Sequence, residues 1–354
     1  MVVLGVDVHK DTHTTVAVDE IGREIGQKTV PARDRGHAAL VRWARAHHPG
    51  GRMWAIEDCR HVSTRLERAL LSAGERVVRV PPKLMAGARA AARTRGKSDP
   101  IDALAIARAA LREPDLPAAE HDRTSRELKL LVDHREDLVA ERTRMQNRVR
   151  WHLHELDPDL DIPSRGLDRL RVLDRLLAWL GQHPPAPQSQ MVARIAAELL
   201  ADIRAVTVRV NALERELSRL VEQVAPQLQA VPGVAGLTAA KIIGEVANMS
   251  RFRSEACFAM HAGVAPIPAS SGRTNRHRLA RAGNRQLNAA LHRIAVTQAR
   301  LPDIPSRTYY QRRLEMGNTK MEALRALKRR LARVVFNLLH TTTSTTTGPQ
   351  PVAA

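Results

Sequence analysis

Four carboxylic acids in the first third of the chain have types and positions suited to metal-dependent chemistry. Asp7 ends one apolar run and Glu57 ends another, and an acid at a strand end can face a site beside the sheet. Asp99 and Asp102 begin a predicted helix and share one face of it. Carboxylate oxygens bind hard divalent cations, and two such ions can stabilise the attacking and leaving oxygens of phosphodiester cleavage. The four acids therefore indicate a metal site for phosphoryl transfer.

Each acid also has an ordinary structural explanation. Asp7 could be a turn residue, and Glu57 or the adjacent Asp58 could cap a helix. Asp99 before Pro100 suits a helix N-cap with proline at N1, which would put Asp102 at N3. On spacing alone, capping is the favoured interpretation of this pair, so the metal site rests on the four acids as a set.

Two nearby patterns do not support a site. His9 and His13 are separated by four positions, but they bridge a strand and a turn and no HExxH motif is present, so we expect neither to be a metal ligand. The GKS at 96–98 lacks the glycine that a phosphate-binding loop needs at position 91, which is Ala91.

A second group of residues, near position 271, combines hydroxyls with cations. Ser270, Ser271 and Gly272 follow two prolines in a predicted loop. A serine is a weak nucleophile unless a base or metal activates it, and neighbouring guanidinium groups could hold a phosphodiester. The arginines that follow are Arg273, Arg276, Arg278, Arg281 and Arg285. From residue types alone, a Ser-Gly turn among DNA-contacting arginines is the favoured interpretation.

The charge of the chain points to a polyanionic partner. The 354 residues contain 56 Lys and Arg against 37 Asp and Glu, a net charge of +19. Residues 251–340 hold 18 basic residues against four acids, an excess of 14, which favours a nucleic-acid surface there. With only four Trp, two Tyr and three Phe, base stacking on aromatic side chains is not expected to dominate.

Other functional classes are disfavoured. The two cysteines, Cys59 and Cys257, are far apart, which excludes a disulfide framework and fits a reducing compartment. We find no apolar run long enough to cross a membrane and no export signal, so we expect a cytoplasmic protein with no membrane partner.

The elements that must position these residues follow from apolar periodicity. Residues 1–112 predict an α/β domain with a mixed sheet: strands at 2–8, 14–18, 24–30, 52–57 and 76–80, and helices at 35–46, 61–73, 84–94 and 100–112. Residues 124–156 predict a long amphipathic helix, and 230–340 predict a basic helical region. The tail at 341–354 is of low complexity and is expected to be disordered.

Residues 190–224 carry the most regular apolar pattern in the chain. Apolar side chains recur at intervals of three and four, as in a heptad seam: Val192, Ile195, Leu199, Ile203, Val206, Val210, Leu213, Leu217, Leu220 and Val224. The partner could be the 124–156 helix of the same chain, in an antiparallel hairpin, or the same segment of a second chain.

Several segments, taken in order, resemble the DEDD transposases of bacterial insertion sequences. These are GVDVHKD with Asp7, AIED with Glu57, KSDPIDALAIA with Asp99 and Asp102, and the later VPGVAGLTAAKIIGEV and GVAPIPASSGRTNRHRLARAGNRQLNAAL. The family is the insertion-sequence-110 type, which includes the Piv-type DNA invertases. The resemblance covers nearly all of the chain except the tail.

The resemblance implies a fold and domain boundaries. It implies a RuvC-like domain of the RNase H fold at 1–115, a helical coiled-coil hairpin at 116–225, an all-α basic transposase domain at 226–340 and a disordered tail at 341–354. The acidic tetrad Asp7, Glu57, Asp99 and Asp102 would bind Mg²⁺. Ser271, which precedes a glycine as the family's catalytic serine does, would attack a DNA phosphate and form a phosphoserine link, with Ser270 as the alternative.

The resemblance also implies partners. In the best understood members a bridge RNA pairs with target and donor DNA, and a dimer of dimers completes composite sites from different subunits. We therefore expect a bacterial, nucleoid-associated recombinase. The alternatives are a metal-dependent junction resolvase without a covalent intermediate and a non-catalytic nucleic-acid scaffold. The group that deprotonates Ser271 stays open between His277 and a metal-bound oxygen.

Overall fold

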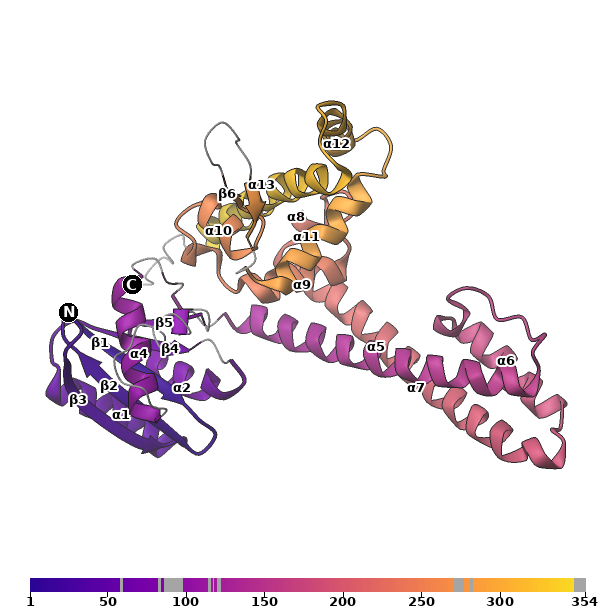
Figure 1. The fold of residues 1–354 in the computed structure, drawn as a ribbon, viewed down its shortest axis with the longest axis horizontal. Helices are drawn as coiled ribbons and strands as arrows, with labels where there is room; N and C mark the ends of the chain where they lie inside the picture. The colour runs from indigo at the N-terminus through magenta and orange to yellow at the C-terminus, as the bar shows by residue number, and fades with distance from the viewer. Residues whose placement is uncertain are drawn as a thin grey trace, which may run out of the picture. The chain divides into compact units, whose positions relative to one another are not determined.

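The computed structural model describes residues 1–57, 60–81, 84–85, 98–113, 116, 118–119, 122–269, 277–280 and 283–346. They form two compact units (Figure 1). Unit 1 comprises Met1–Asp122 with Asn248–Phe258, and unit 2 comprises Arg123–Ala247 with Ala259–Ala354. Unit 1 therefore extends slightly beyond the first domain expected from the sequence, and unit 2 joins the helical pair to the basic region.

Unit 1 is built on a five-stranded mixed sheet. Its strands are β1 (Val2–Val8), β2 (Thr12–Val18), β3 (Glu24–Pro31), β4 (Arg52–Glu57) and β5 (Val77–Val80). The spatial order is β3-β2-β1-β4-β5; β1 pairs with β2 and β2 with β3 antiparallel, whereas β1 pairs with β4 and β4 with β5 parallel. This order, with three meandering strands followed by two parallel ones, is that expected of an RNase H-type sheet, so the predicted α/β class is confirmed.

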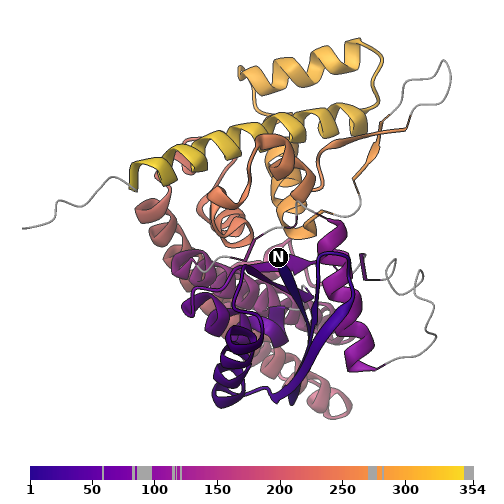
Figure 2. The same ribbon diagram turned by 90° about the vertical axis from the view of Figure 1, so that its left-hand side faces the viewer.

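Helices cover both faces of this sheet because the central strands are apolar on both sides. On one face, Val3, Ala55 and Val78 pack with alanines of α4 (Asp99–Arg112). On the other, Leu4 and Trp54 pack with α1 (Asp34–His47) and α2 (Arg60–Ser72). Figure 2 shows α4 and α1 on opposite sides of the sheet. The predicted helix at 84–94 lies mostly outside the described residues.

Unit 2 contains a long antiparallel pair of helices, α5 (Arg123–Leu156) and α7 (Gln190–Val224). Nε of Arg135 on α5 donates to Glu214 on α7 at 3.0 Å, and Arg142 lies 3.3 Å from the hydroxyl of Thr207, so rising numbers on one helix meet falling numbers on the other. This is the in-chain hairpin, the first of the two partners considered for the heptad seam.

The buried line of α7 differs from the predicted seam. Ile203, Val210 and Leu217 are buried as expected, but the line continues through Ala196, Leu200, Thr207 and Val221, and the other seam residues are half-buried. Several helices besides α5 pack on α7: α6 (Leu170–Gln182) joins Ala196 and Leu200 in a core with Leu173 and Leu176, and α9 (Gly236–Val246) packs on α7 as well.

The remaining elements form the basic part of the chain. The helices are α8 (Pro226–Gln229), α9 (Gly236–Val246), α10 (Glu255–His261), α11 (Arg285–Gln298), α12 (Pro305–Glu315) and α13 (Lys320–Thr346), with short 3₁₀ turns at Gly166–Asp168, Pro187–Ser189 and Met249–Arg251. Because α13 runs to Thr346, the helical region passes the expected boundary at 340; residues 347–354 lie outside the described part.

The expectation of an all-α C-terminal region is wrong in one respect. Strands β6 (Pro266–Pro268) and β7 (His277–Leu279) form a small antiparallel hairpin around the serine loop. Each strand is three residues long and β6 has prolines at both ends, so neither carries the apolar alternation by which strands are recognised. Within the described part of the chain, no helix has the length and apolar character needed to span a membrane.

Candidate functional site

The acidic site of unit 1 depends on how β1 meets α4. Side chains alternate along a strand, so Val3, Gly5 and Asp7 face α4 while Leu4 and Val6 face α1 and α2. Gly5 lies directly beneath the helix: a Cβ there would come within 2.2 Å of the carbonyl oxygen of Ala103. The absence of a side chain at Gly5 therefore lets the first turn of α4 approach the end of β1, where Asp7 is.

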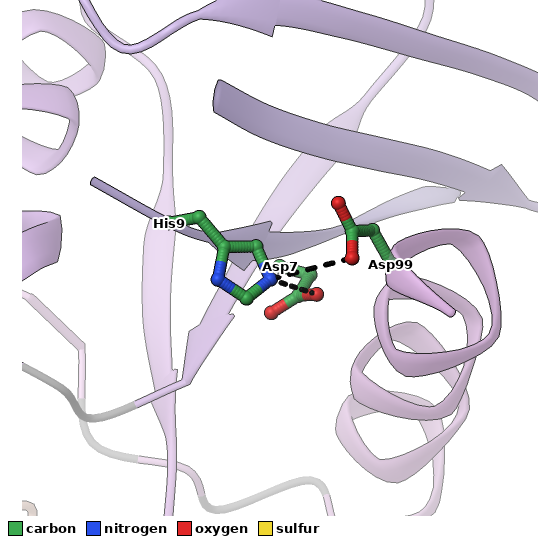
Figure 3. A group of neighbouring side chains, drawn as sticks. All are labelled: Asp7, His9 and Asp99. Atoms are coloured by element: carbon green, nitrogen blue, oxygen red, sulfur yellow. Dashed lines mark hydrogen bonds and ion pairs between the residues drawn. The ribbon is translucent and has the colours of Figure 1, made fainter. Parts of the chain in front are cut away.

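Three side chains meet at this point (Figure 3). Nε2 of His9 lies 3.0 Å from Oδ2 of Asp7 and 3.5 Å from Oδ1 of Asp99. Asp7 is buried, whereas His9 and Asp99 are about half exposed. One potential ligand atom from each of the three lies within 4.8 Å of the others. The site is thus anchored by a buried carboxylate and open on one side.

The other two acids of the predicted tetrad lie on elements that flank this group. Asp102, one turn along α4 from Asp99, is buried and close enough to Asp7 to influence its titration. Glu57 ends β4, one residue past the last β1–β4 pair, Val6 with Ile56, and its position in the alternation places it on the α4 face. The 4.8 Å group contains neither of these acids. The structure brings Asp7 and Asp99 together with His9, places Asp102 one turn further along α4, and places Glu57 on the adjacent strand.

The surroundings of Asp7 raise the pKa of its carboxyl. Burial raises the pKa of the Asp7 carboxyl, and the nearby carboxylates of Asp102 and Asp99 raise it further, while His9 opposes the shift. A cation bound among these oxygens would offset both the burial and the repulsion. The residues present therefore fit a divalent metal ion: oxygen donors on rigid elements, with one imidazole nitrogen beside them.

The capping explanation for Asp99 is wrong in its position. Ser98 is the N-cap residue of α4, with extended backbone angles, and Asp99 is already the first helical residue with Pro100 after it. The carboxylate of Asp99 lies beside His9. The acids of SDPID are thus displaced by one position from the predicted cap, to N1 and N4, where both side chains can reach the end of β1.

His9 is the site residue that sequence reasoning missed. The sequence pattern groups it only with His13, as two residues that bridge a strand and a turn without an HExxH motif, and the two lie on opposite faces of the sheet. His13 is buried against α1, where its ring stacks on His37. The informative spacing is the interval of two between Asp7 and His9, because residues two apart on a strand lie on the same face. His9 stands where β1 ends, and its backbone N–H donates to the Thr12 carbonyl at 3.0 Å.

The predicted serine site, Ser270, Ser271 and Gly272, lies outside the described residues. Three of the five arginines lie outside them too: Arg273, Arg276 and Arg281. Arg278 on β7 and Arg285 at the start of α11 are described, and both are exposed. His277, a candidate base for the serine, is exposed at the start of β7.

The base of the serine loop is tightly built within unit 2. Gly263 and Gly283 touch: a Cβ at Gly283 would come within 2.2 Å of the Gly263 nitrogen. Nδ2 of Asn288 donates to the carbonyls of Ala262 at 3.0 Å and Gly263 at 2.9 Å. Nζ of the buried Lys328 donates to Oδ1 of Asn288 at 2.9 Å. Both ends of the 264–282 segment are therefore held at one place.

The other side of this base is anchored to α9. Asn284 caps α11 by accepting from the Leu287 N–H at 2.9 Å, and its Nδ2 donates to Glu245 at 2.6 Å. Glu245 is buried and also pairs with Lys129 of α5. The loop end is thus joined through Glu245 to the long helical pair.

Comparison with known proteins agrees with the two-part organisation of the site residues. Residues 4–158 match a DEDD-type family described as Transposase, and residues 225–311 match the Transposase IS116/IS110/IS902 family. The first match contains all four acids, and the second contains the serine loop. Together they cover both regions on which the resemblance was based.

Curated relatives align along almost the whole chain. An insertion element IS116 protein of Streptomyces clavuligerus is 28% identical, covering 95% of this chain and 94% of the relative. An insertion element IS110 protein of Streptomyces coelicolor is 27% identical, covering 96% and 94%. A putative transposase of Sinorhizobium fredii is 24% identical, covering 81% and 70%.

A solved structure, T. thermophilus RuvC in complex with a Holliday junction substrate, is 17% identical and covers 34% of this chain and 99% of that one, with a TM-score of 0.27. This score adds nothing to the sheet topology described above. The two family matches and the full-length relatives carry the assignment: the chain belongs to the IS110 family of transposases, enzymes that cut and rejoin DNA.

Proposed function

We propose that this transposase is an RNA-guided serine recombinase with a Mg²⁺-binding acidic site. The observation that supports its metal site best is the meeting of Asp7 and Asp99 at the end of β1, with the buried Asp102 one turn along α4. Asp7, Glu57, Asp99 and Asp102 would hold the ion, and the bound ion would stabilise negative charge on the phosphate oxygens of the DNA.

The reaction of the chain's own residues begins at Ser271. Its Oγ attacks a DNA phosphorus, the bond from phosphorus to the departing strand oxygen breaks, and a phosphoserine link forms. The serine proton passes to a base, for which His277 is the candidate among the chain's own side chains. A hydroxyl of the incoming strand then attacks the same phosphorus and releases Ser271, so the number of phosphodiester bonds is conserved.

The basic side chains near the loop hold the nucleic acid. Arg273, Arg276, Arg278, Arg281 and Arg285 would contact phosphates of target and donor DNA, positioning the duplex without reading its sequence. Sequence recognition would be delegated to a bridge RNA that pairs with both DNAs, which suits a basic and aromatic-poor protein. The active assembly would be a dimer of dimers.

The test is to trap the covalent link. Protein purified with its noncoding RNA is incubated with target DNA and Mg²⁺, denatured, and resolved to detect DNA attached to protein. We expect an adduct that Ser271→Ala abolishes and Ser270→Ala, the matched neighbour, retains. An adduct unchanged in Ser271→Ala overturns the serine assignment.

A metal-dependent junction resolvase is the second candidate, favoured by the acidic site alone. It predicts Mg²⁺-dependent nicking that survives Ser271→Ala and leaves no DNA on the protein. A non-catalytic scaffold predicts salt-dependent binding of DNA or RNA that Asp7→Ala leaves unchanged. The same denaturing gel, run with both variants, separates all three.

A further inference from the structure

The position of His9 adds a nitrogen donor to a site otherwise made of oxygens. His9 is held where β1 ends, because its N–H donates to Thr12 C=O at 3.0 Å and closes the turn into β2. Its side chain projects to the same side as Asp7, and its Nε2 is the atom that approaches both Asp7 and Asp99 (Figure 3). The imidazole thus lies at the open side of the acidic site with its nitrogen pointing inward.

The distances among the three side chains match those among ligands of one ion. Neighbouring ligands in an octahedral shell with metal–ligand bonds of about 2.1 Å lie about 3.0 Å apart. The nitrogen lies 3.0 Å from Oδ2 of Asp7 and 3.5 Å from Oδ1 of Asp99. Only a small movement of the half-exposed Asp99 and His9 side chains is needed for all three to bind one cation.

The carboxyl groups near His9 supply the oxygen donors of the site. Asp7 and Asp102 are both 6% exposed, and Asp99 adds a third carboxylate at the same place. The nitrogen of His9 therefore stands beside carboxylate oxygens of Asp7 and Asp99, close enough for one ion to be shared by all three side chains.

We propose that His9 is a metal ligand and that it makes this site prefer a first-row transition-metal ion over Mg²⁺. The proposal rests on the proposed metal site and adds its selectivity. Mg²⁺ is bound through oxygen donors, whereas imidazole nitrogen binds transition ions well. Mn²⁺ is the weakest binder of the first-row divalent series, so a preference for Mn²⁺ over Mg²⁺ is a strict test.

The experiment measures binding to the full-length protein without DNA. Mn²⁺ is titrated and its free ion followed by electron paramagnetic resonance, and Mg²⁺ is added as competitor. We expect Mn²⁺ to bind at least about tenfold more tightly than Mg²⁺, and His9→Asn to weaken Mn²⁺ binding about tenfold with little change for Mg²⁺. His47→Asn, an exposed histidine on α1, is the matched control and should change neither.

A spectroscopic signature separates ligation from a merely structural role. Electron spin echo modulation of bound Mn²⁺ should show a coupled ¹⁴N nucleus in the natural protein and in His47→Asn, but not in His9→Asn. Two results would overturn the role of His9 and leave the acidic site standing. One is bound Mn²⁺ without the ¹⁴N signal in the natural protein; the other is a Mn²⁺ affinity of His9→Asn equal to that of the natural protein. If the natural protein binds neither ion, the proposed metal site fails as well.

Discussion

The α-carbon of Gly5 lies under the backbone of Ala103, so closely that a methyl group on it would come within 2.2 Å of the Ala103 carbonyl oxygen and 2.5 Å of the Ala107 nitrogen. Both neighbours are helix backbone, which cannot rotate away as a side chain can. This contact fixes the height of α4 over β1 and hence the distance between Asp7 and the two acids of the helix.

Gly5→Ala should therefore damage both the fold and the site. We expect the free energy of unfolding to fall by about 3 kcal/mol, because α4 must lift from the sheet, and the stabilisation by divalent metal to be lost. Chemical denaturation with and without Mn²⁺ measures both. Gly50→Ala is the control, since a Cβ there meets nothing within 4 Å. Unchanged metal stabilisation in Gly5→Ala would show that α4 does not set the site.

Neutralising Asp7 should stabilise the metal-free protein. Burial in the folded chain raises the pKa of Asp7 above its ordinary value of 3.8, so between the two values the folded state binds more protons than the unfolded state. The free energy of unfolding then falls as pH rises through that window, and at neutral pH the ionised Asp7 is a cost. We expect the Asp7→Asn variant without metal to melt at a higher temperature than the natural protein without metal. We also expect added divalent metal to raise the melting temperature of the natural protein but not that of Asp7→Asn.

The exposed Asp11, in the turn after β1, supplies the control for this prediction. Asp11→Asn should leave the melting temperature unchanged and keep the response to metal. If Asp7→Asn instead lowers the melting temperature of the metal-free protein, then the surroundings of Asp7 stabilise its carboxylate. That result would overturn the proposal that a cation offsets the burial of Asp7.

Much of unit 1 was predictable, because its strands are short apolar runs whose ends coincide with the acids. The strands that carry Asp7 and Glu57 end where expected. What local pattern could not give is the crossing of α4 over Gly5, which depends on packing between segments about a hundred residues apart. That crossing decides whether Asp99 acts as a cap or as a site residue, so the choice was out of reach of spacing alone.

The differences between the sequence interpretation and the structure have the same physical origin. His9 and His13 bridge a strand and a turn and form no HExxH motif, which gave no reason to place His9 beside Asp7; strand alternation sends the two histidines to opposite faces of the sheet. The buried line of α7 departs from the heptad seam because α5, α6 and α9 all pack on this helix, contacts that its own periodicity does not contain. The roles of Ser271 and of the guide RNA stay predictions, since the serine lies outside the described residues.

The buried histidine pair of unit 1 should make its stability depend on pH. Burial, and then the neighbouring His37, lowers the pKa of His13 from 6.5 to about 4. His37 itself faces Asp34, which is paired with Arg65, and burial lowers its pKa too. Well above pH 6.5, His13 is neutral in both the folded and the unfolded protein. As the pH falls from 6.5 towards 4, His13 takes up a proton in the unfolded protein first, and the free energy of unfolding falls by about 3 kcal/mol.

Denaturation curves between pH 7 and 4 test this. His13→Phe keeps a stacking ring but cannot be protonated, so its free energy of unfolding should vary much less with pH than that of the natural protein. His47→Phe, at an exposed position, should retain the full dependence. Equal pH dependence in His13→Phe and the natural protein would assign the effect to other groups.

Asn288 should be the most sensitive position at the base of the serine loop. Its amide donates to two carbonyls, of Ala262 and Gly263, and accepts from Lys328, whose pKa is lowered by burial and by Arg325. Asn288→Ala leaves two loop carbonyls and a buried ammonium group without this partner. We expect a loss of about 2–4 kcal/mol in the free energy of unfolding of unit 2.

Gln286→Ala is the matched control for Asn288→Ala, because it removes an amide from the same helix at an exposed position. It should change stability by less than about 0.5 kcal/mol. Covalent adduct formation adds a second measurement: at a temperature where both variants are folded, Asn288→Ala should form the adduct more slowly, since the ends of the loop are no longer held together. If the two variants match in stability and in adduct rate, the Asn288 amide does not organise the loop, and the contact between Gly263 and Gly283 suffices to close it.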